Sequence, residues 1–353
     1  MSNNHSGYGN PGIYKPRNPK ASRYYQCVAD HFETLEMIWE ERYERQYGFW
    51  RSWIRHVIYR YLACGDCHCG FARVKCKGCG HEYLLAFSCK RRHFCPSCHQ
   101  KRVVEFGEWL YTDVLKSVPH RQWVFSLPKR LRIYFMYDRK LLAKLSRCAW
   151  SVLSAYLKTS ISGDNATPGA VVAVRTFGDF QNFNPHLHVI ATDGCFSGNG
   201  IFQVAQRPNP KDLEHRFRYE VLKMLKAEGK INEAVIENML SWHHSGFNVY
   251  CGSAIWPRNE DALEKLARYI IRAAFSQERM TYIRDYKTSD GIAKVIYRSK
   301  DGREERTFHA LDWLAQLTTV MPQMPGANEH HQFYRRTWHN RKDSTPPWAL
   351  GYP

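Results

Sequence analysis

Residues 184–192 read NPHLHVIAT, a pattern that predicts a β-strand over 186–192. Side chains two apart on a strand share a face, so we expect His186 and His188 to point one way and Leu187 and Val189 to point into the core. Two imidazoles in this arrangement can chelate one divalent ion and leave positions open for substrate oxygens. Ordinary packed or surface histidines also occur in such pairs, so the meaning of this pair depends on the rest of the chain.

Around this strand the sequence mixes helical and strand-like segments. Further strands are expected over 121–127, 170–176 and 247–251, helices over 31–47, 49–62, 103–118, 138–159, 211–228, 231–242 and 260–275, and a hairpin over 292–307. Such a mixture predicts an α+β sandwich, in which helices pack on one sheet.

The helix expected over 260–275 carries a candidate nucleophile, Tyr269. Its apolar stripe is made of Leu263, Leu266, Ile270 and Ala274. At 100° per residue, Tyr269 falls about 120° from the centre of that stripe, on a flank shared with Lys265 and Arg272. A phenol beside two cations could be eased towards phenolate and attack a phosphate. An ordinary half-buried tyrosine fits the same pattern, so the helix alone does not decide.

Cysteine spacing points to zinc. Of 12 cysteines, eight lie between residues 64 and 98, and in a chain without a dispersed disulfide pattern such clustering favours a metal. The pairs Cys76/Cys79 and Cys95/Cys98 have the spacing by which two short turns complete a tetrahedron of thiolates. The remaining candidates form a second site or pack around the first, and the sequence leaves both open: Cys64, Cys67, Cys69, Cys89 and His93.

The overall charge indicates a polyanionic partner. Lys and Arg number 51 against 33 Asp and Glu, a formal net charge of +18, and nucleic acid is the polyanion that best explains it. Basic and aromatic residues alternate near the cysteines, where Lys90, Arg91 and Arg92 lie close to Tyr83 and Phe87. No apolar run approaches a membrane span and no signal core opens the chain, so we expect a cytoplasmic protein without a membrane partner.

Several segments, in this order, resemble transposases of the IS91 type, which belong to the His-hydrophobe-His superfamily of single-strand endonucleases. They are KCKGCGHEYLLAFSCKRRHFCPSC (75–98), RQWVFSLP (121–128), FNPHLHVIATDGCF (183–196), LARYIIRAAFSQERM (266–280) and YRRTWHNRK (334–342). The resemblance implies a flexible tail over 1–24, a helical zinc-binding domain over 25–112 and a ferredoxin-like nuclease domain over 118–353. It also implies rolling-circle transposition of DNA through single-stranded ends, with a homodimer as one possible assembly.

The resemblance also implies roles for single residues. His186 and His188 become ligands of Mg²⁺ or Mn²⁺, and Tyr269 becomes the nucleophile of a one-tyrosine enzyme. By their charge and position, Lys265, Arg272, Lys90, Arg91 and Arg92 are expected to contact DNA. The implied zinc ligands are Cys76, Cys79, Cys89, Cys95 and Cys98. A third ligand of the catalytic metal is expected among Gln181, Asp193 and Glu278.

Two other functions fit the same residues. A replication initiator or relaxase would use the same site on different DNA, although the cysteine module makes this less consistent. A zinc-ribbon DNA-binding regulator would keep the module without catalysis. Covalent attachment to a DNA strand separates the enzymes from the regulator.

Overall fold

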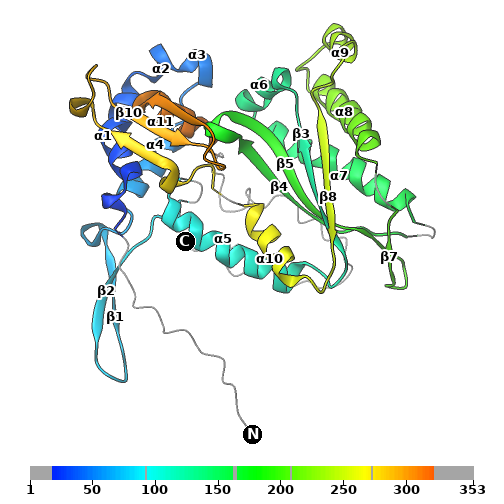
Figure 1. Cartoon of the computed structure of the whole chain (residues 1–353), viewed down its shortest axis with the longest axis horizontal. Helices are drawn as coiled ribbons and strands as arrows, with labels where there is room; N and C mark the ends of the chain where they lie inside the picture. The colour runs from blue at the N-terminus through cyan, green and yellow to red at the C-terminus, as the bar shows by residue number, and fades with distance from the viewer. Residues whose placement is uncertain (1–17, 92–93, 162–164, 207–208, 272, 322–353) are drawn as a thin grey trace.

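The computed structural model describes residues 18–91, 94–161, 165–206, 209–271 and 273–321. Its architecture combines helices with antiparallel sheets (Figure 1), as the sequence predicts. The helices are α1 (Arg23–Met37), α2 (Trp39–Arg42), α3 (Glu44–Tyr47), α4 (Trp53–Leu62), α5 (Pro96–Trp109), α6 (Lys129–Tyr137), α7 (Lys140–Thr159), α8 (Pro210–Ala227), α9 (Glu233–Leu240), α10 (Glu260–Tyr269) and α11 (Ala310–Val320). The assignment to a ferredoxin-like nuclease fold stays a prediction.

Four strands build the larger sheet, in the order β4 (Ala170–Phe177), β5 (Phe183–Thr192), β3 (His120–Ser126) and β8 (Asn248–Ile255), each antiparallel to its neighbour. Alternation along these strands separates two apolar faces. Leu187 and Val189 lie on one face, in a core with residues of α7 and α8. Ile190 lies on the other, in a smaller core with residues of α5 and α10. The sheet is therefore covered on both sides.

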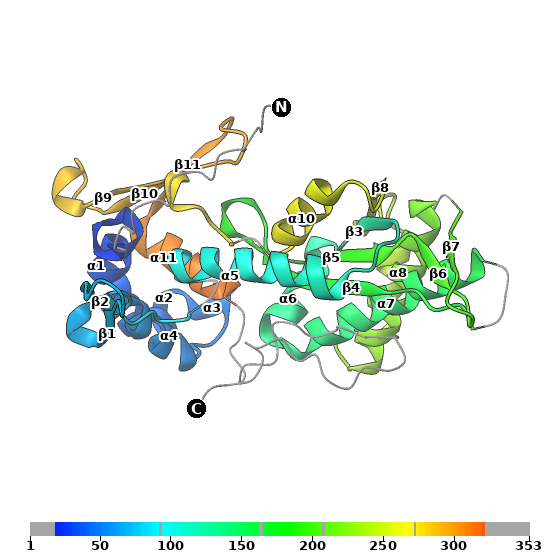
Figure 2. The ribbon, with the colours of Figure 1, turned by 90° about the horizontal axis from the view of Figure 1, so that it is seen from below.

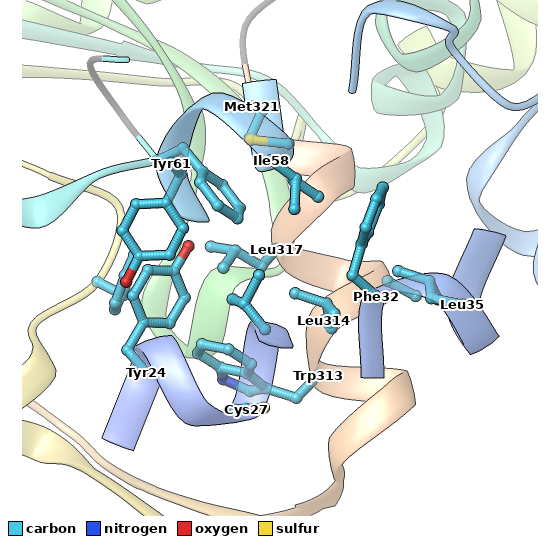
Figure 3. Packing of buried hydrophobic residues seen from close by; sticks show 14 of the residues in the cluster. Tyr24, Cys27, Phe32, Leu35, Ile58, Tyr61, Trp313, Leu314, Leu317 and Met321 are labelled. Atoms are coloured by element: carbon cyan, nitrogen blue, oxygen red, sulfur yellow. The ribbon is translucent and has the colours of Figure 1, made fainter. Parts of the chain in front are cut away.

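A second core lies at the other end of the molecule. It joins helices from the start of the chain to a segment from its described end, because Tyr24 of α1 and Tyr61 of α4 pack with Trp313 and Leu314 of α11 (Figure 3). A three-stranded sheet of β9 (Met280–Ile283), β10 (Lys294–Arg298) and β11 (Glu305–His309) contributes buried residues to the same core. The segment expected to form one catalytic domain, 118–353, thus contributes to this second core as well as to the cores on the two faces of the larger sheet.

Helix α5 connects the two ends (Figure 2). It begins beside Cys95, in this second core, and Phe106 near its other end packs against Leu266 and Ile270 of the α10 segment. The contact is close, because a Cβ added to Gly107 would lie 2.6 Å from Cγ of Arg268. Through α5, the segment that contains the cysteines is therefore packed against the helix that carries Tyr269.

Three expectations differ from the structure. The helix expected over 103–118 is α5, which starts earlier because Pro96 suits the first helical turn. The helix expected over 260–275 ends at Tyr269. Residues of the cysteine segment form an unexpected hairpin of β1 (Phe71–Lys75) and β2 (Glu82–Ala86). A separate short pair, β6 (Gly194–Phe196) and β7 (Phe202–Val204), comes after β5. The expected tail and the motif at 334–342 lie largely or wholly outside the described residues.

Candidate functional site

His186 and His188 lie on the β5 face that α5 and α10 cover, as the alternation predicts. Their ring centroids are 5.0 Å apart. The Nδ1 atom of His186 lies 2.8 Å from the backbone oxygen of Asn184. A carbonyl oxygen can only accept, so Nδ1 of His186 carries the proton and, in the neutral ring, Nε2 keeps its lone pair. His186 is therefore held in the tautomer that a metal ligand needs.

His188 is buried, and its Nδ1 atom lies 3.2 Å from Nε2 of the Gln122 side-chain amide, on the neighbouring strand β3. An amide offers both a donor and an acceptor, and its two orientations differ by exchange of the oxygen and nitrogen positions. In the exchanged orientation, with the oxygen towards the ring, Gln122 accepts a hydrogen bond from Nδ1–H, and the lone pair of the neutral His188 ring lies on Nε2. Sequence reasoning did not single out Gln122, whose position on RQWVFSL becomes meaningful only when β3 pairs with β5.

Tyr269 lies next to the histidine pair. It is the last residue of α10, and its ring centroid is 5.6 Å from that of His188, with the two rings nearly perpendicular. These residues are far apart in the sequence and come from different elements, a strand and a helix. The fold thus brings together the three residues that the sequence singled out for catalysis.

Arg175 connects the strand pair that carries the histidines to the end of α10, which carries Tyr269. It lies on β4 directly opposite His186 in register and is only 3% exposed. Its Nε atom donates to the backbone oxygen of Ile270 at 3.2 Å, and a second guanidinium nitrogen donates to the backbone oxygen of Tyr269. These are carbonyls that the last helical turn leaves unsatisfied. Arg175 therefore caps the end of α10 at Tyr269 and Ile270.

Two cations that the sequence did not single out lie next to the Tyr269 ring. The guanidinium carbon of Arg175 lies 4.7 Å from the ring centroid, and Nζ of Lys300, from the β10–β11 turn, lies 5.9 Å from it. Lys265 is exposed on α10, and Arg272 lies outside the described residues. A charged residue inside the apolar run AVVAVRT was the available sequence signal for Arg175. Lys300 had none, because its approach depends on tertiary structure.

The three candidates for a further metal ligand have different surroundings. Asp193 receives a bidentate pair from Arg121, at 2.7 and 2.8 Å, beyond the opposite end of β5 from the histidines. Glu278 lies in a short 3-10 turn. Gln181 lies in the turn that leads into β5, is 1% exposed, and neither of its amide atoms has a hydrogen-bond partner among the described residues. A buried amide without partners is costly, which favours Gln181 over Asp193.

Four buried cysteines form a compact cluster: Cys64, Cys89, Cys95 and Cys98. Sulfur pairs in it lie 3.6 to 3.8 Å apart, matching the separation of about 3.8 Å that follows from four thiolates each about 2.3 Å from a tetrahedral zinc. Backbone N–H groups donate to two of the sulfurs, those of Cys64 and Cys89. Side-chain hydrogen bonding, first from Cys89, lowers the pKa of Cys64 to about 7. The cluster suits structural zinc.

This cluster differs from the expected set of ligands. Cys76 and Cys79 lie at the tip of the β1–β2 hairpin and are exposed, outside the cluster that contains Cys95 and Cys98. The spacing of the two pairs is that of a zinc ribbon, but β1 and β2 carry the first pair away from the second (Figure 1). Cys64, which the sequence left open, takes part instead, while Cys67 and Cys69 are exposed.

The basic residues beside Cys89 are only partly available to DNA. Lys90 is exposed, whereas a guanidinium nitrogen of Arg91 lies 2.7 Å from the imidazole of His56. Arg92 and His93 lie outside the described residues. No helix among the described residues is long and apolar enough to cross a membrane.

Comparison with known proteins finds transposases along most of the chain. Residues 34–127 match the model of a family described as a transposase zinc-binding domain, and residues 169–331 match a family described as "Putative transposase". The chain is 30% identical over 151 residues to the transposase for insertion sequence element IS801 of Pseudomonas savastanoi, covering 42% of this chain but only 35% of that relative. It is 24% identical over 294 residues to a protein named as a possible transposase of Sinorhizobium fredii, covering 78% of this chain and 70% of that relative. No solved structure matches the chain.

Proposed function

Because this chain belongs to the family of IS91-type transposases, we propose that it is a metal-dependent strand transferase that nicks and rejoins single-stranded DNA at the ends of a mobile element. The observation that supports this most directly is the approach of Tyr269 to the His186–His188 pair. A nucleophile beside two imidazoles that can hold a divalent ion suits cleavage of a phosphodiester.

The histidine pair fits a divalent ion. The Nδ1–H of His186 donates to the Asn184 backbone oxygen, so its lone pair lies on Nε2, and Gln122, with its amide oxygen towards the ring, holds His188 in the same tautomer. Gln181, buried and without a hydrogen-bond partner among the described residues, is the proposed third ligand. Bound Mg²⁺ or Mn²⁺ would neutralise negative charge on the scissile phosphate.

The chain's own residues perform the transfer. The phenolic oxygen of Tyr269 forms a bond to phosphorus, the bond from phosphorus to the 3′ oxygen breaks, and the released strand ends in a 3′-hydroxyl. Tyr269 loses its proton and the 3′ oxygen gains one. The 5′-phosphotyrosine link conserves the energy of the broken bond, so a second 3′-hydroxyl can reverse the step without ATP.

Zinc has a structural part in this proposal. We assign it to Cys64, Cys89, Cys95 and Cys98, at the start of α5, where it would fix the N-terminal core and the helix that packs on α10. The exposed cysteines at the hairpin tip are not needed for this site.

The decisive experiment incubates the full-length protein with Mn²⁺ and single-stranded oligonucleotides carrying the ends of its element. A covalent protein–DNA adduct should form, resist denaturation, and leave a free 3′-hydroxyl on the other fragment. Tyr269→Phe and His186→Ala should each abolish the adduct. Binding with no adduct in the native protein would favour the non-catalytic regulator, and an adduct that persists in Tyr269→Phe would exclude this nucleophile.

A further inference from the structure

Lys300 reaches the Tyr269 site from the other core of the molecule. It lies in the turn between β10 and β11, where the Ser299 N–H donates to the Glu304 backbone oxygen at 2.8 Å. Val295 and Tyr297 anchor β10 in the core formed with α1 and α11. The hairpin therefore has a rigid base and carries its turn to the ring of Tyr269, 5.9 Å from the lysine Nζ atom.

The other cations of this hairpin are paired with acids, and Lys300 differs from them. Arg298 pairs with Glu305, and Arg303 and Arg306 approach Asp301 and Glu304. Asp301, the acid next to Lys300, also accepts from the Ser299 hydroxyl at 2.6 Å and from the Arg303 N–H at 3.2 Å. Within the described ranges no carboxylate lies at ion-pair distance from Lys300. Its charge faces the tyrosine ring instead.

Arg175, the second cation at the ring, already uses its donors within the protein. It is buried, and its donors serve the backbone oxygens of Tyr269 and Ile270. Lys300 is exposed and flexible, so it is the cation of the two that a substrate can recruit. A phosphate attacked by the Tyr269 phenol must lie within bonding distance of the phenolic oxygen, close to this ammonium group.

We propose that Lys300 is a catalytic residue that contacts a non-bridging oxygen of the scissile phosphate at Tyr269. This inference rests on the proposed function of Tyr269 and adds a contribution from the second core. Negative charge on the non-bridging oxygens must be neutralised as the phenol attacks, and an ammonium group held there stabilises the transition state more than the bound substrate. The site is complete only when the β10–β11 hairpin is in place.

The test compares Lys300→Gln with Lys300→Arg and with Lys287→Gln in the full chain. Lys287 is a matched control, because its Nζ lies 5.6 Å from the ring of Tyr286, a surface pair outside the site. We expect Lys300→Gln to slow adduct formation at saturating oligonucleotide by about 10- to 100-fold, with less than a threefold change in DNA affinity. Lys300→Arg should recover most of the rate, and Lys287→Gln should match the native protein.

A native rate in Lys300→Gln would overturn the inference, and so would an effect on DNA affinity alone, which would make the lysine a general DNA tether. Equal losses in Lys300→Gln and Lys287→Gln would overturn it too, since they would report surface charge only. Tyr269→Phe in the same assay separates this inference from the proposed function. If Tyr269→Phe abolishes the adduct and Lys300→Gln does not change it, only the role of Lys300 fails.

Discussion

Arg175 carries more of the site geometry than any other single residue. It is buried in β4, opposite His186 in the sheet, and bonds the carbonyls at the end of α10. One side chain thus connects the strand pair that carries the histidines to the helix that carries the tyrosine. Burial of a guanidinium is costly unless its donors are used, and these donors are used to fix Tyr269.

Replacing Arg175 should uncouple Tyr269 from the histidines. Arg175→Met leaves the helix-end carbonyls without donors, so we expect a loss of about 1–3 kcal/mol in the free energy of unfolding and adduct formation slower by about tenfold or more. DNA affinity should change little, and Arg175→Lys should be intermediate because it keeps the charge. Denaturant unfolding and single-turnover adduct assays measure both effects.

Arg132→Met is the matched control for this prediction. Arg132 also directs two nitrogens to a carbonyl, that of Leu127, but it lies on α6. Arg132→Met should lower the free energy of unfolding but leave the rate of adduct formation unchanged. A native rate in Arg175→Met would show that Arg175 does not position the tyrosine.

His120 gives the protein a pH-dependent stability. Burial lowers the pKa of His120 to about 4, so the folded protein keeps this ring neutral while the unfolded chain, with a pKa near 6.5, takes up a proton as the pH falls. The contribution is fully present above about pH 6.5 and is lost towards pH 4. The free energy of unfolding that His120 removes between pH 7 and pH 5 is about 2 kcal/mol.

Urea unfolding of His120→Gln against the native chain at pH 7 and pH 5 measures this contribution. The native protein should lose more free energy of unfolding over this interval than the variant. Burial also lowers the pKa of His31, so some loss should remain in the variant. Equal losses in the two proteins would contradict the assignment to His120.

Among the elements, α5 and α10 form the contact that positions Tyr269, the proposed nucleophile. Gly107 allows the two helices to approach, because any larger residue there meets Arg268. Arg268 also pairs with Glu264 one turn earlier, which restricts its movement. The packing of these helices sets the distance between Tyr269 and the sheet.

Gly107→Ala should displace α10 and slow adduct formation by about tenfold, because small misplacements of reacting groups are costly. Arg268→Ala removes the side chain in the way, so the double variant should recover to near the rate of Arg268→Ala alone. Val104→Ala, on the exposed side of α5, should have the native rate. Additive effects of the two substitutions would rule out this contact as the cause.

At the scale of the whole molecule, α5 contributes both to the N-terminal core and to the smaller core between the sheet and α10. The cysteine cluster lies where α5 begins. Cys64, Cys89, Cys95 and Cys98 belong to the same core as α1 and α11. Loss of a metal at this position would loosen the N-terminal core, and it would also release the end of α5 that lies farther from Tyr269. Structural zinc would therefore contribute folding free energy to both ends of the protein.

Single substitutions separate the ligand set of the structure from that expected from spacing. Cys64→Ser should lower the zinc content by about one ion per chain and lower the melting temperature, whereas Cys76→Ser should keep the ion in the buried cluster. Metal analysis of the purified variants, with circular dichroism on heating, tests this. Retention of zinc in Cys64→Ser together with its loss in Cys76→Ser would restore the ribbon pairing.

Much of the fold was predictable where the pattern is local. The strands at 121–127, 170–176 and 186–192 are seen at nearly those positions, because short apolar runs rich in β-branched residues are typical of buried strands. The β1–β2 hairpin and α11 were missed. The hairpin is exposed on both faces and so has little alternation to detect, and α11 is almost wholly buried and so has little amphipathic contrast.

The sequence by itself determined the chemistry on offer: two histidines on one face of a strand, a tyrosine on a helix flank, thiols at metal-binding spacing, and an excess of positive charge. Spacing along the chain encodes these features directly. Only the tertiary structure decided that Arg175 and Lys300, rather than Lys265, approach the Tyr269 ring, and that Cys64 replaces the hairpin cysteines. Those choices depend on contacts between segments far apart in sequence, which no local period records.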